Sequence, residues 1–193
     1  MTLHKIAQIG HPVLREVARP VTRDELTTPA VQGFIDDLVE TMRDASGAGL
    51  AATQVYEKLR IVAIEVGDNP RYPYKPKYPL TIVVNPEVTP LSDITFENFE
   101  GCLSVPNIRG RVKRFAEVRV RGQGRNGEQL DFEIRGVTAG TFQHETDHLN
   151  GVLFVDKNRL ADDKSLCTWE HFERFEKERF VTEVRELVAR WGS

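Results

Sequence analysis

The segment from residue 143 to residue 149, Gln-His-Glu-Thr-Asp-His-Leu, constrains this chain more than any other part of its sequence. His144 and His148 are four residues apart, so on a helix both imidazoles lie on the same face. Two imidazoles in that register can bind one divalent metal ion, with Glu145 placed to reach a water molecule on the ion. The alternative is a surface helix with two histidines and two acids. Because the chain has only five histidines, the sequence favours the metal site.

A catalytic metal site of this kind needs a third protein ligand and an open position for water. No histidine follows His148 closely, and the extended His-x-x-Gly-x-x-His pattern of some metallopeptidases is absent from the sequence. Cys102 stands upstream in the polar segment Glu-Gly-Cys-Leu-Ser at residues 100–104. A lone cysteine is more often a small core residue. Together with the helix motif, however, Cys102 is predicted to be the third ligand.

Three segments resemble the motifs of the peptide deformylase family of bacterial type. Residues 100–104 and 143–149 resemble two of these motifs, and the third is similar to Gly-Ala-Gly-Leu-Ala-Ala-Thr-Gln at residues 47–54. The three segments occur in the family's order and rough spacing, and residues 10–21 are similar to the family's start. The resemblance covers about the first 160 residues.

The resemblance implies a metal-dependent hydrolase that removes the N-formyl group from the formyl-methionine of nascent polypeptides and releases formate. Cys102, His144 and His148 would hold one divalent ion per chain. The family implies Fe²⁺ in the native enzyme, with Zn²⁺ or Ni²⁺ also able to bind. A thiolate and two imidazoles suit zinc and are compatible with ferrous iron, so the ligands alone leave the metal open.

The resemblance also implies a role for several further residues. Glu145 would take a proton from the attacking water and deliver it to the leaving amine. The side-chain amide of Gln54 and the backbone N–H of Leu103 would stabilise the oxyanion. Gly49 and Arg109 match family positions that contact the substrate peptide, although Arg109 could equally be a surface arginine.

Other positions near the motifs carry weaker expectations. Glu100 would orient the cysteine segment and Asp147 would support a ligand, with a purely structural role equally open for each. Ala48 and Gly140 stand where many deformylases carry bulkier aliphatic residues, and Thr146 replaces a commonly apolar one. A roomier pocket for the first side chain of the substrate is therefore expected.

Composition limits the other classes of function. The chain of 193 residues is 40% hydrophobic and 28% charged, which is typical of a globular protein with a core. A net charge of −3 gives no general case for binding nucleic acid or a membrane surface. There is no apolar span of about 20 residues and no apolar signal-peptide core, so a cytoplasmic enzyme is expected. In that reducing compartment a disulfide between Cys102 and Cys167 is not expected.

Local patterns predict an α+β fold in which antiparallel sheets surround a central metal-binding helix, with one N-terminal and one C-terminal helix. Thr28 and Pro29 open the N-terminal helix as its N-cap and first residue. Strands are expected at 59–66 and 80–86. Asn126-Gly127 is the strongest hairpin signal.

The second half of the chain completes this prediction of one catalytic domain over residues 1–193. The metal-binding helix is expected from near Thr138 to just before Asn150, and an amphipathic helix from about 166 to 191. Family members can use this last region to contact the ribosome, but its charges are mixed here. Residues 67–79 are rich in proline and tyrosine. They are predicted to form an ordered loop that packs its own aromatic side chains, and a peptide-binding surface is the less favoured alternative.

Two other functions remain open on the sequence. A metallopeptidase would share Glu145 and both histidines, but the cysteine and glutamine segments count against it. A non-catalytic metal protein would need neither Glu145 nor Gln54, and both are present.

Overall fold

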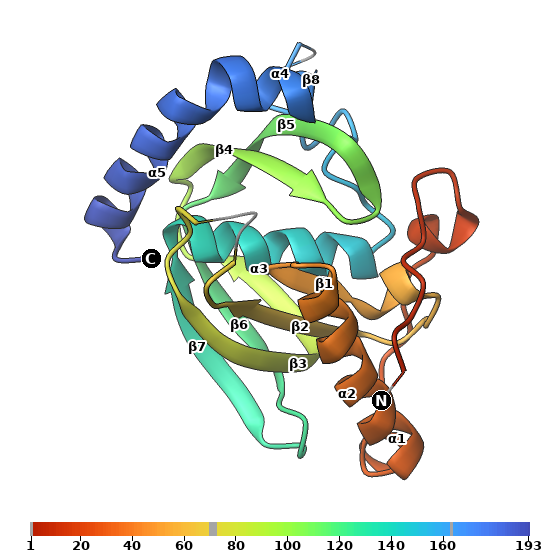
Figure 1. The fold of residues 1–193 in the computed structure, drawn as a ribbon. Coiled ribbons are helices and arrows are strands. Elements are labelled where there is room, and N and C mark those ends of the chain that lie inside the picture. Colours follow the sequence, from red (N-terminus) through yellow and green to blue (C-terminus); the bar gives the residue numbers. More distant parts are fainter. Residues whose placement is uncertain (1, 70–72, 163) are drawn as a thin grey trace.

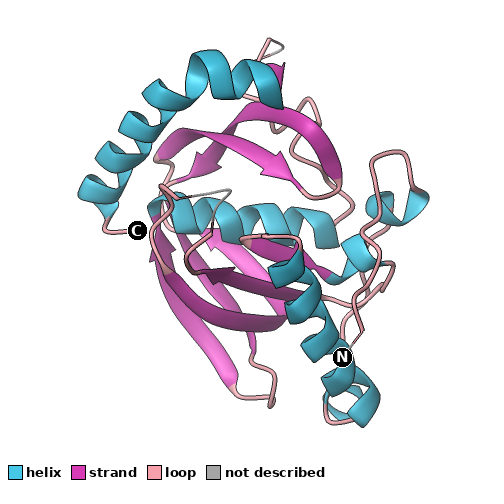
Figure 2. Cartoon of the chain, viewed as in Figure 1, coloured by secondary structure: helices cyan, strands magenta, loops and turns pink. Residues whose placement is uncertain are grey.

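The computed structural model describes residues 2–69, 73–162 and 164–193. Its centre is helix α3 (Gly136–Leu149), and the two antiparallel sheets lie on opposite sides of this helix (Figure 1). Figure 2 shows the same arrangement by secondary structure, with one helix running between two groups of strands. The predicted α+β fold with sheets around the central helix is confirmed. Within the described ranges, every helix is too short or too polar to cross a bilayer.

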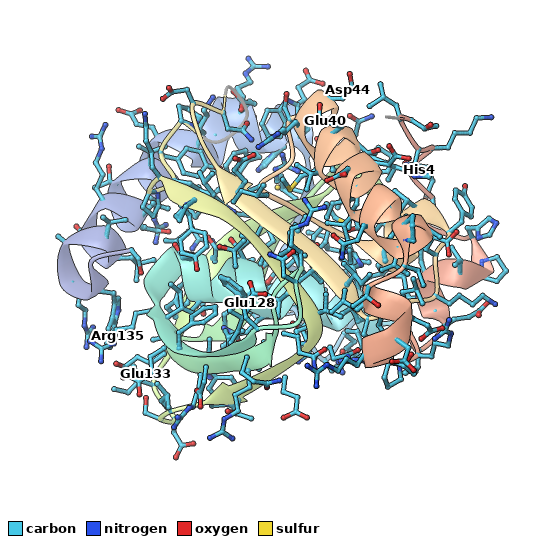
Figure 3. All side chains as sticks on the ribbon, turned by 90° about the horizontal axis from the view of Figure 1, so that it is seen from below. His4, Glu40, Asp44, Glu128, Glu133 and Arg135 are labelled. Carbon is cyan, nitrogen blue, oxygen red and sulfur yellow. The ribbon has the colours of Figure 1, made fainter. Side chains whose placement is uncertain are left out.

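The larger sheet has five strands in the order β1-β2-β3-β6-β7. They are β1 (Gly49–Ala51), β2 (Ile61–Val66), β3 (Tyr78–Pro90), β6 (Glu117–Gln123) and β7 (Gln129–Arg135). The predicted hairpin joins β6 to β7, and Gly127 in its loop has a φ of +83°, which favours glycine. Figure 3 shows Glu133 and Arg135 pointing outward from β7, as the alternation of exposed and half-buried residues along this strand requires.

Each face of this sheet is covered by one helix. Ile61 and Ala63 of β2 pack in the same cluster as α2 (Pro29–Asp44), whereas Val62 and Ile64 pack in the cluster that includes α3. The period of two along a strand explains this division. Thr28 accepts a hydrogen bond from the backbone N–H of Val31 at 3.3 Å, so the predicted N-cap is confirmed.

The smaller sheet has the order β4-β5-β8, with β4 (Thr95–Cys102), β5 (Val105–Phe115) and β8 (Leu166–Thr168). The expected start of the last helix at 166 is wrong, because residues 166–168 pair with residues 108–110 of β5. This pairing satisfies backbone groups at the edge of β5 that would otherwise lack a partner strand. The helix begins instead at Trp169, where the hydroxyl of Thr168 accepts from the N–H of His171 at 3.2 Å.

The remaining elements are short, except for the end of the chain. They are η1 (Pro12–Arg15), α1 (Arg23–Leu26), η2 (Ala52–Val55), α4 (Trp169–His171), the π-helical turn η3 (Phe172–Glu176) and α5 (Lys177–Trp191). Pro12 is the first residue of the helical turn η1, where its missing N–H needs no partner.

Two tyrosines of the proline- and tyrosine-rich segment contact helices of the fold. Tyr78 belongs to β3 and lies edge-on to Phe142 of α3, with ring centroids 5.7 Å apart. Tyr74 packs in the same way on Phe180 of α5 at 5.3 Å. Pro70 and Tyr72 lie outside the described residues. Tyr74 and Tyr78 therefore each contact another element of the fold.

Candidate active site

Helix α3 positions the two histidines of the central motif. It begins at Gly136, two residues before the expected start, and ends at Leu149 as expected. The Nε2 atoms of His144 and His148 lie 3.3 Å apart, and both rings are almost fully buried. The four-residue spacing therefore places both imidazoles at one point, as the sequence predicted.

Cys102 at the end of β4 completes this cluster. Its Sγ lies 3.2 Å from Nε2 of His148, and the ligand atoms of Cys102, His144 and His148 all lie within 4.8 Å of one another. Donors at usual bond lengths from one tetrahedral ion are roughly 3.3–3.6 Å apart. The donor set and these separations therefore fit a single divalent ion of intermediate softness.

Glu100 of β4 fixes the orientation of His144. Its Oε2 lies 2.8 Å from Nδ1 of His144, and because the carboxylate is the acceptor, Nδ1 carries the proton and Nε2 faces the other ligands. Although burial raises the pKa of the Glu100 carboxyl, Arg114 and His144 hold it well below its usual range. Glu100 thus contacts His144 directly, whereas the sequence predicted such support from Asp147.

Arg114 of β5 joins the two buried acids near the cluster. It donates to both oxygens of Glu100 at 2.8 Å and to Asp147 at 2.6 Å, and its side chain is 2% exposed. Asp147 also accepts from Arg159 at 2.6 Å. Asp147 therefore acts on the site through Arg114. The sequence alone did not indicate Arg114, because an arginine within the basic run of residues 109–114 is typical of a protein surface.

The two histidines have different surroundings. Burial lowers the pKa of His148 well below its usual value, and the neighbouring His144 lowers it further, so His148 is neutral. Its Nδ1 is buried and has no hydrogen-bond partner among the described residues. Burial also lowers the pKa of His144, but the charge of Glu100 outweighs it and raises that pKa well above the usual value.

Glu145 lies beside the cluster in a space that depends on Gly49. Burial raises the pKa of Glu145 to about 7, while His144 and Lys75 act in the opposite direction. A Cβ atom at Gly49 would lie 2.5 Å from Oε1 of Glu145, so a side chain at this position would displace the carboxylate. Oε2 of Glu145 has no hydrogen-bond partner within the described part of the chain.

Gln54 of η2 approaches the cluster from the larger sheet. Its Nε2 donates to Oγ of Ser104 at 3.1 Å and to Sγ of Cys102 at 3.5 Å, while its Oε1 accepts from the N–H of Ala51 at 2.9 Å. The amide N–H₂ group therefore points toward the thiol. Gln54, Leu103 and Glu145 line one cavity together with Cys102 and His144.

Comparison with known proteins decides what kind of site this is. The family model described as polypeptide deformylase matches residues 3–164. Peptide deformylase of Leptospira biflexa is 45% identical over 159 residues, covering 81% of this chain and 88% of the relative. Peptide deformylase 1 of Bordetella pertussis is 43% identical, with the same coverage.

The chain belongs to the polypeptide deformylase family.

Solved deformylases share the fold. The class I type b peptide deformylase of Acinetobacter baumannii with Met-Ala-Ser bound has a TM-score of 0.77 and 38% identity, covering 80% of this chain and 97% of its own. The Synechococcus elongatus deformylase in complex with actinonin has a TM-score of 0.71 and 28% identity, covering 98% of this chain and 86% of its own. Deformylases are metal-dependent hydrolases that remove the N-formyl group from nascent polypeptides, and the metallopeptidase alternative is not favoured.

One deformylase-like position lies outside the cavity. Arg109 is 4% exposed, so it is not a surface arginine. Its guanidinium lies 4.3 Å from the ring centroid of Trp169 and against the backbone of Gly101, where a Cβ would overlap it. It lines a second hollow with Cys102, Asn107 and Trp169. The substrate contact of Arg109 therefore stays a prediction.

The cavity around Ala48 and Gly140 is lined in part by polar residues. Ala48 and Gly140 line it, as expected, whereas Thr146 is not among its lining residues. A Cβ at Gly140 would lie 3.3 Å from the ring of Phe96, which occupies part of the space left by the glycine. The sequence analysis did not find three polar residues of the lining, Lys75, Asn98 and Thr141, because they come from three separate elements.

Proposed function

We propose that Cys102, His144 and His148 hold one divalent ion and that this site hydrolyses the N-formyl group of peptides beginning with formyl-methionine. One observation carries the proposal. The three ligand atoms converge within 4.8 Å, in a cavity that Glu145 and Gln54 also line. When bound, a divalent ion of this kind polarises a carbonyl and lowers the pKa of water. We propose Fe²⁺ as the native metal, with Zn²⁺ or Ni²⁺ able to replace it.

Glu145 moves the proton in this proposal. With a pKa of about 7, its carboxylate can accept a proton from the attacking water and return it to the leaving amine. Gly49 keeps the space in which this side chain lies, and its backbone would contact the substrate peptide. Arg109 is proposed as a second peptide contact, from the side of β5.

Gln54 and Leu103 stabilise the oxyanion that forms from the formyl oxygen. The Nε2 group of Gln54 is held near Cys102 because Ala51 donates to the other end of the amide. The N–H of Leu103 follows the ligand cysteine directly in the chain. Donors fixed in advance need no reorganisation when charge develops.

The first test measures metal content and formate release together, on protein purified without oxygen and assayed with formyl-Met-Ala-Ser. We expect about one metal ion per chain and metal-dependent formate release. Glu145→Ala keeps the metal, because Glu145 is not a ligand, and loses about 10²–10⁴-fold in kcat. Metal at full stoichiometry without formate in the parent protein would contradict the proposal, and peptide-bond cleavage would then indicate a metallopeptidase.

Gln54→Ala tests the oxyanion donor separately. We expect kcat to fall by about 10²–10³-fold with the metal retained. A variant that lost its metal instead would show that Gln54 serves mainly to orient the thiol of Cys102.

The setting of the reaction is also a proposal. We propose that the enzyme acts in the cytoplasm, because formylated nascent chains are made there. A transient contact of α5 with the ribosome is also part of the proposal, although this helix carries acidic and basic side chains together.

A further inference from the structure

Strand β4 and helix α3 run side by side along the wall of the catalytic cavity. Glu100 of β4 contacts His144 of α3, and Nδ2 of Asn98 lies 3.9 Å from the position that a Cβ at Gly140 would take. Two residues along a strand and four along a helix both span about 6–7 Å, so these two contacts stay in step. Asn98 and Gly140 therefore lie about one helical turn from the metal ligands, and both line the cavity.

Gly140 leaves room in front of the Asn98 amide. A Cβ at this position would lie 3.3 Å from the ring of Phe96, so a larger side chain would fill the gap between the helix and Asn98. Ala48 lines the same cavity with a side chain of a single carbon atom. If the formyl carbon lies beside the ligands, the first side chain of the substrate reaches this space by extending over one helical turn. Its end then meets the side chain of Asn98.

The amide of Asn98 is buried with its acceptor end unpaired. The residue is 3% exposed, and its Oδ1 has no hydrogen-bond partner among the described residues. An amide oxygen is an acceptor, and leaving it unpaired away from water is unfavourable. Lys75 and Thr141, which line the same end, are hydrogen-bonded to each other at 3.2 Å. The unpaired atom identified here is therefore an acceptor, and the matching group on a ligand is a hydrogen-bond donor.

We propose that this end of the cavity binds a neutral hydrogen-bond donor on the first side chain, so that the enzyme also deformylates peptides beginning with formyl-glutamine. This inference rests on the proposed function and concerns the substrates of the same site. The reaction is the same hydrolysis, in which water cleaves the C–N bond of the formyl group and yields formate and the free α-amine of the glutamine.

Glutamine fits this space by its length and by its chemistry. Its side chain is unbranched up to the terminal amide and is similar in length to that of methionine. Its amide N–H₂ group can donate to Oδ1 of Asn98. The thioether of methionine has no N–H or O–H group, so it leaves this oxygen unpaired.

A neutral donor suits this end of the cavity better than a charged side chain. Lys75 places an ammonium group here, which repels a cationic side chain such as that of lysine. An ionised carboxylate such as that of glutamate is an acceptor only and cannot donate to Asn98. A primary amide carries no net charge and supplies the N–H donor.

The first test compares kcat/KM for three peptides: formyl-Gln-Ala-Ser, formyl-Met-Ala-Ser and the γ-methyl ester of formyl-Glu-Ala-Ser. The ester keeps the side-chain carbonyl of glutamine but lacks its N–H donors. We expect the glutamine peptide to be used at least as well as the methionine peptide, and about tenfold or more better than the ester, because the ester leaves a buried acceptor unpaired. Use of the glutamine peptide no better than the ester, or more than about tenfold worse than the methionine peptide, would overturn the inference.

Asn98→Leu removes the acceptor with little change in side-chain size. It should lower the glutamine-to-methionine ratio of kcat/KM by about tenfold or more. Glu97→Leu is the matched control, because Glu97 precedes Asn98 in β4 and its exposed side chain lies on the other face of the strand. It should leave the ratio unchanged. Equal ratios in the parent protein and in Asn98→Leu would overturn the inference.

Equilibrium binding separates this inference from the proposed function. The freshly prepared deformylated peptides Gln-Ala-Ser and Met-Ala-Ser can be titrated into the metal-loaded parent protein and variants. We expect Asn98→Leu to weaken the binding of Gln-Ala-Ser relative to Met-Ala-Ser, and Glu97→Leu to leave this preference unchanged. Failure to release formate from any of the formyl peptides would overturn the proposed function. Formate release with no effect of Asn98→Leu on the relative binding of the two peptides would overturn the inference alone.

Discussion

Helix α3 and the C-terminal segment from Leu166 to Trp191 are both attached to β4, but by opposite means. On the α3 side, buried charged groups make the contact: Glu100 lies 2.8 Å from Nδ1 of His144, and its partner Arg114 donates to Asp147 at 2.6 Å. On the C-terminal side, Phe172 and Phe180 pack edge-on against Phe99, with ring centroids 5.1 and 5.6 Å apart. One face of the same strand therefore depends on paired charges and the other on apolar burial.

The two regions also differ in their relation to the family. The family model ends at residue 164, before the C-terminal segment begins. Phe99 nevertheless lines the catalytic cavity and rests on Phe180, while Arg111 lies over the Phe99 ring at 4.4 Å and pairs with Glu183 at 3.0 Å. The segment outside the family model thus supports one wall of the site from behind. We therefore expect that a variant on the C-terminal side can lower the stability of the protein without removing its metal site.

The largest effect is expected at Arg114. Arg114→Leu leaves Glu100 buried without its arginine partner, while Asp147 keeps Arg159, and we expect the free energy of unfolding to fall by about 3–5 kcal/mol. Metal affinity should fall as well, because Glu100 orients His144. Urea denaturation and metal titration measure the two effects.

The control for Arg114 is Arg119→Leu, which removes an exposed pair with Asp131. We expect it to change the free energy of unfolding by at most about 1 kcal/mol. Equal losses in the two variants would contradict the view that burial makes the α3 side depend on charge.

Phe180→Ala tests the other side of the comparison. Removing this fully buried ring should lower the free energy of unfolding by about 3–5 kcal/mol, while the folded protein still binds one metal ion per chain. Phe175→Ala removes a ring that is 63% exposed and should change stability by no more than about 0.5 kcal/mol. Loss of metal binding in folded Phe180→Ala protein would contradict the view that the C-terminal segment contributes stability without affecting the metal site.

The smallest change in stability is expected where Arg15 of η1 contacts Asp156 in the loop after α3. Asp156 accepts from Arg15 at 2.7 and 2.8 Å and from the N–H of Leu153 at 2.9 Å. Burial raises the pKa of Asp156, but these hydrogen bonds outweigh it and lower that pKa below its usual value. The folded state therefore binds this proton less readily than the unfolded state. The stabilisation is present above the unfolded pKa of about 3.9 and is lost as pH falls through the folded pKa.

Asp156→Asn should therefore lower the free energy of unfolding by about 1 kcal/mol or less at pH 7. Its difference from the parent protein should shrink as the pH falls below about 4. Unfolding measured between pH 7 and pH 3 checks this. A difference that stayed constant over that range would show that packing, and not the charge of Asp156, makes the contact.

Local patterns in the sequence were enough for the elements that depend on near neighbours. The spacing of His144 and His148 predicted a shared helix face because the helical repeat sets it. Thr28 predicted a helix start and Asn126-Gly127 a hairpin, since caps and tight turns are decided within a few residues. Each of these predictions is confirmed. The three ligand candidates are also brought together. Cys102 was paired with the histidines because the helix motif needed a third ligand, and the family resemblance implied the same set.

Tertiary structure alone decided the features that join distant segments. Glu100, Arg114 and Asp147 meet from β4, β5 and α3, and nothing next to them in the chain distinguishes a buried arginine from an exposed one. Leu166–Thr168 became a strand because the edge of β5 offered unpaired backbone groups, which overrode the helical pattern after it. Lys75 and Asn98 likewise reach one cavity only through folding. Contacts between distant segments depend on how the whole chain packs. A short motif, in contrast, predicts only the geometry of residues that are close along the chain.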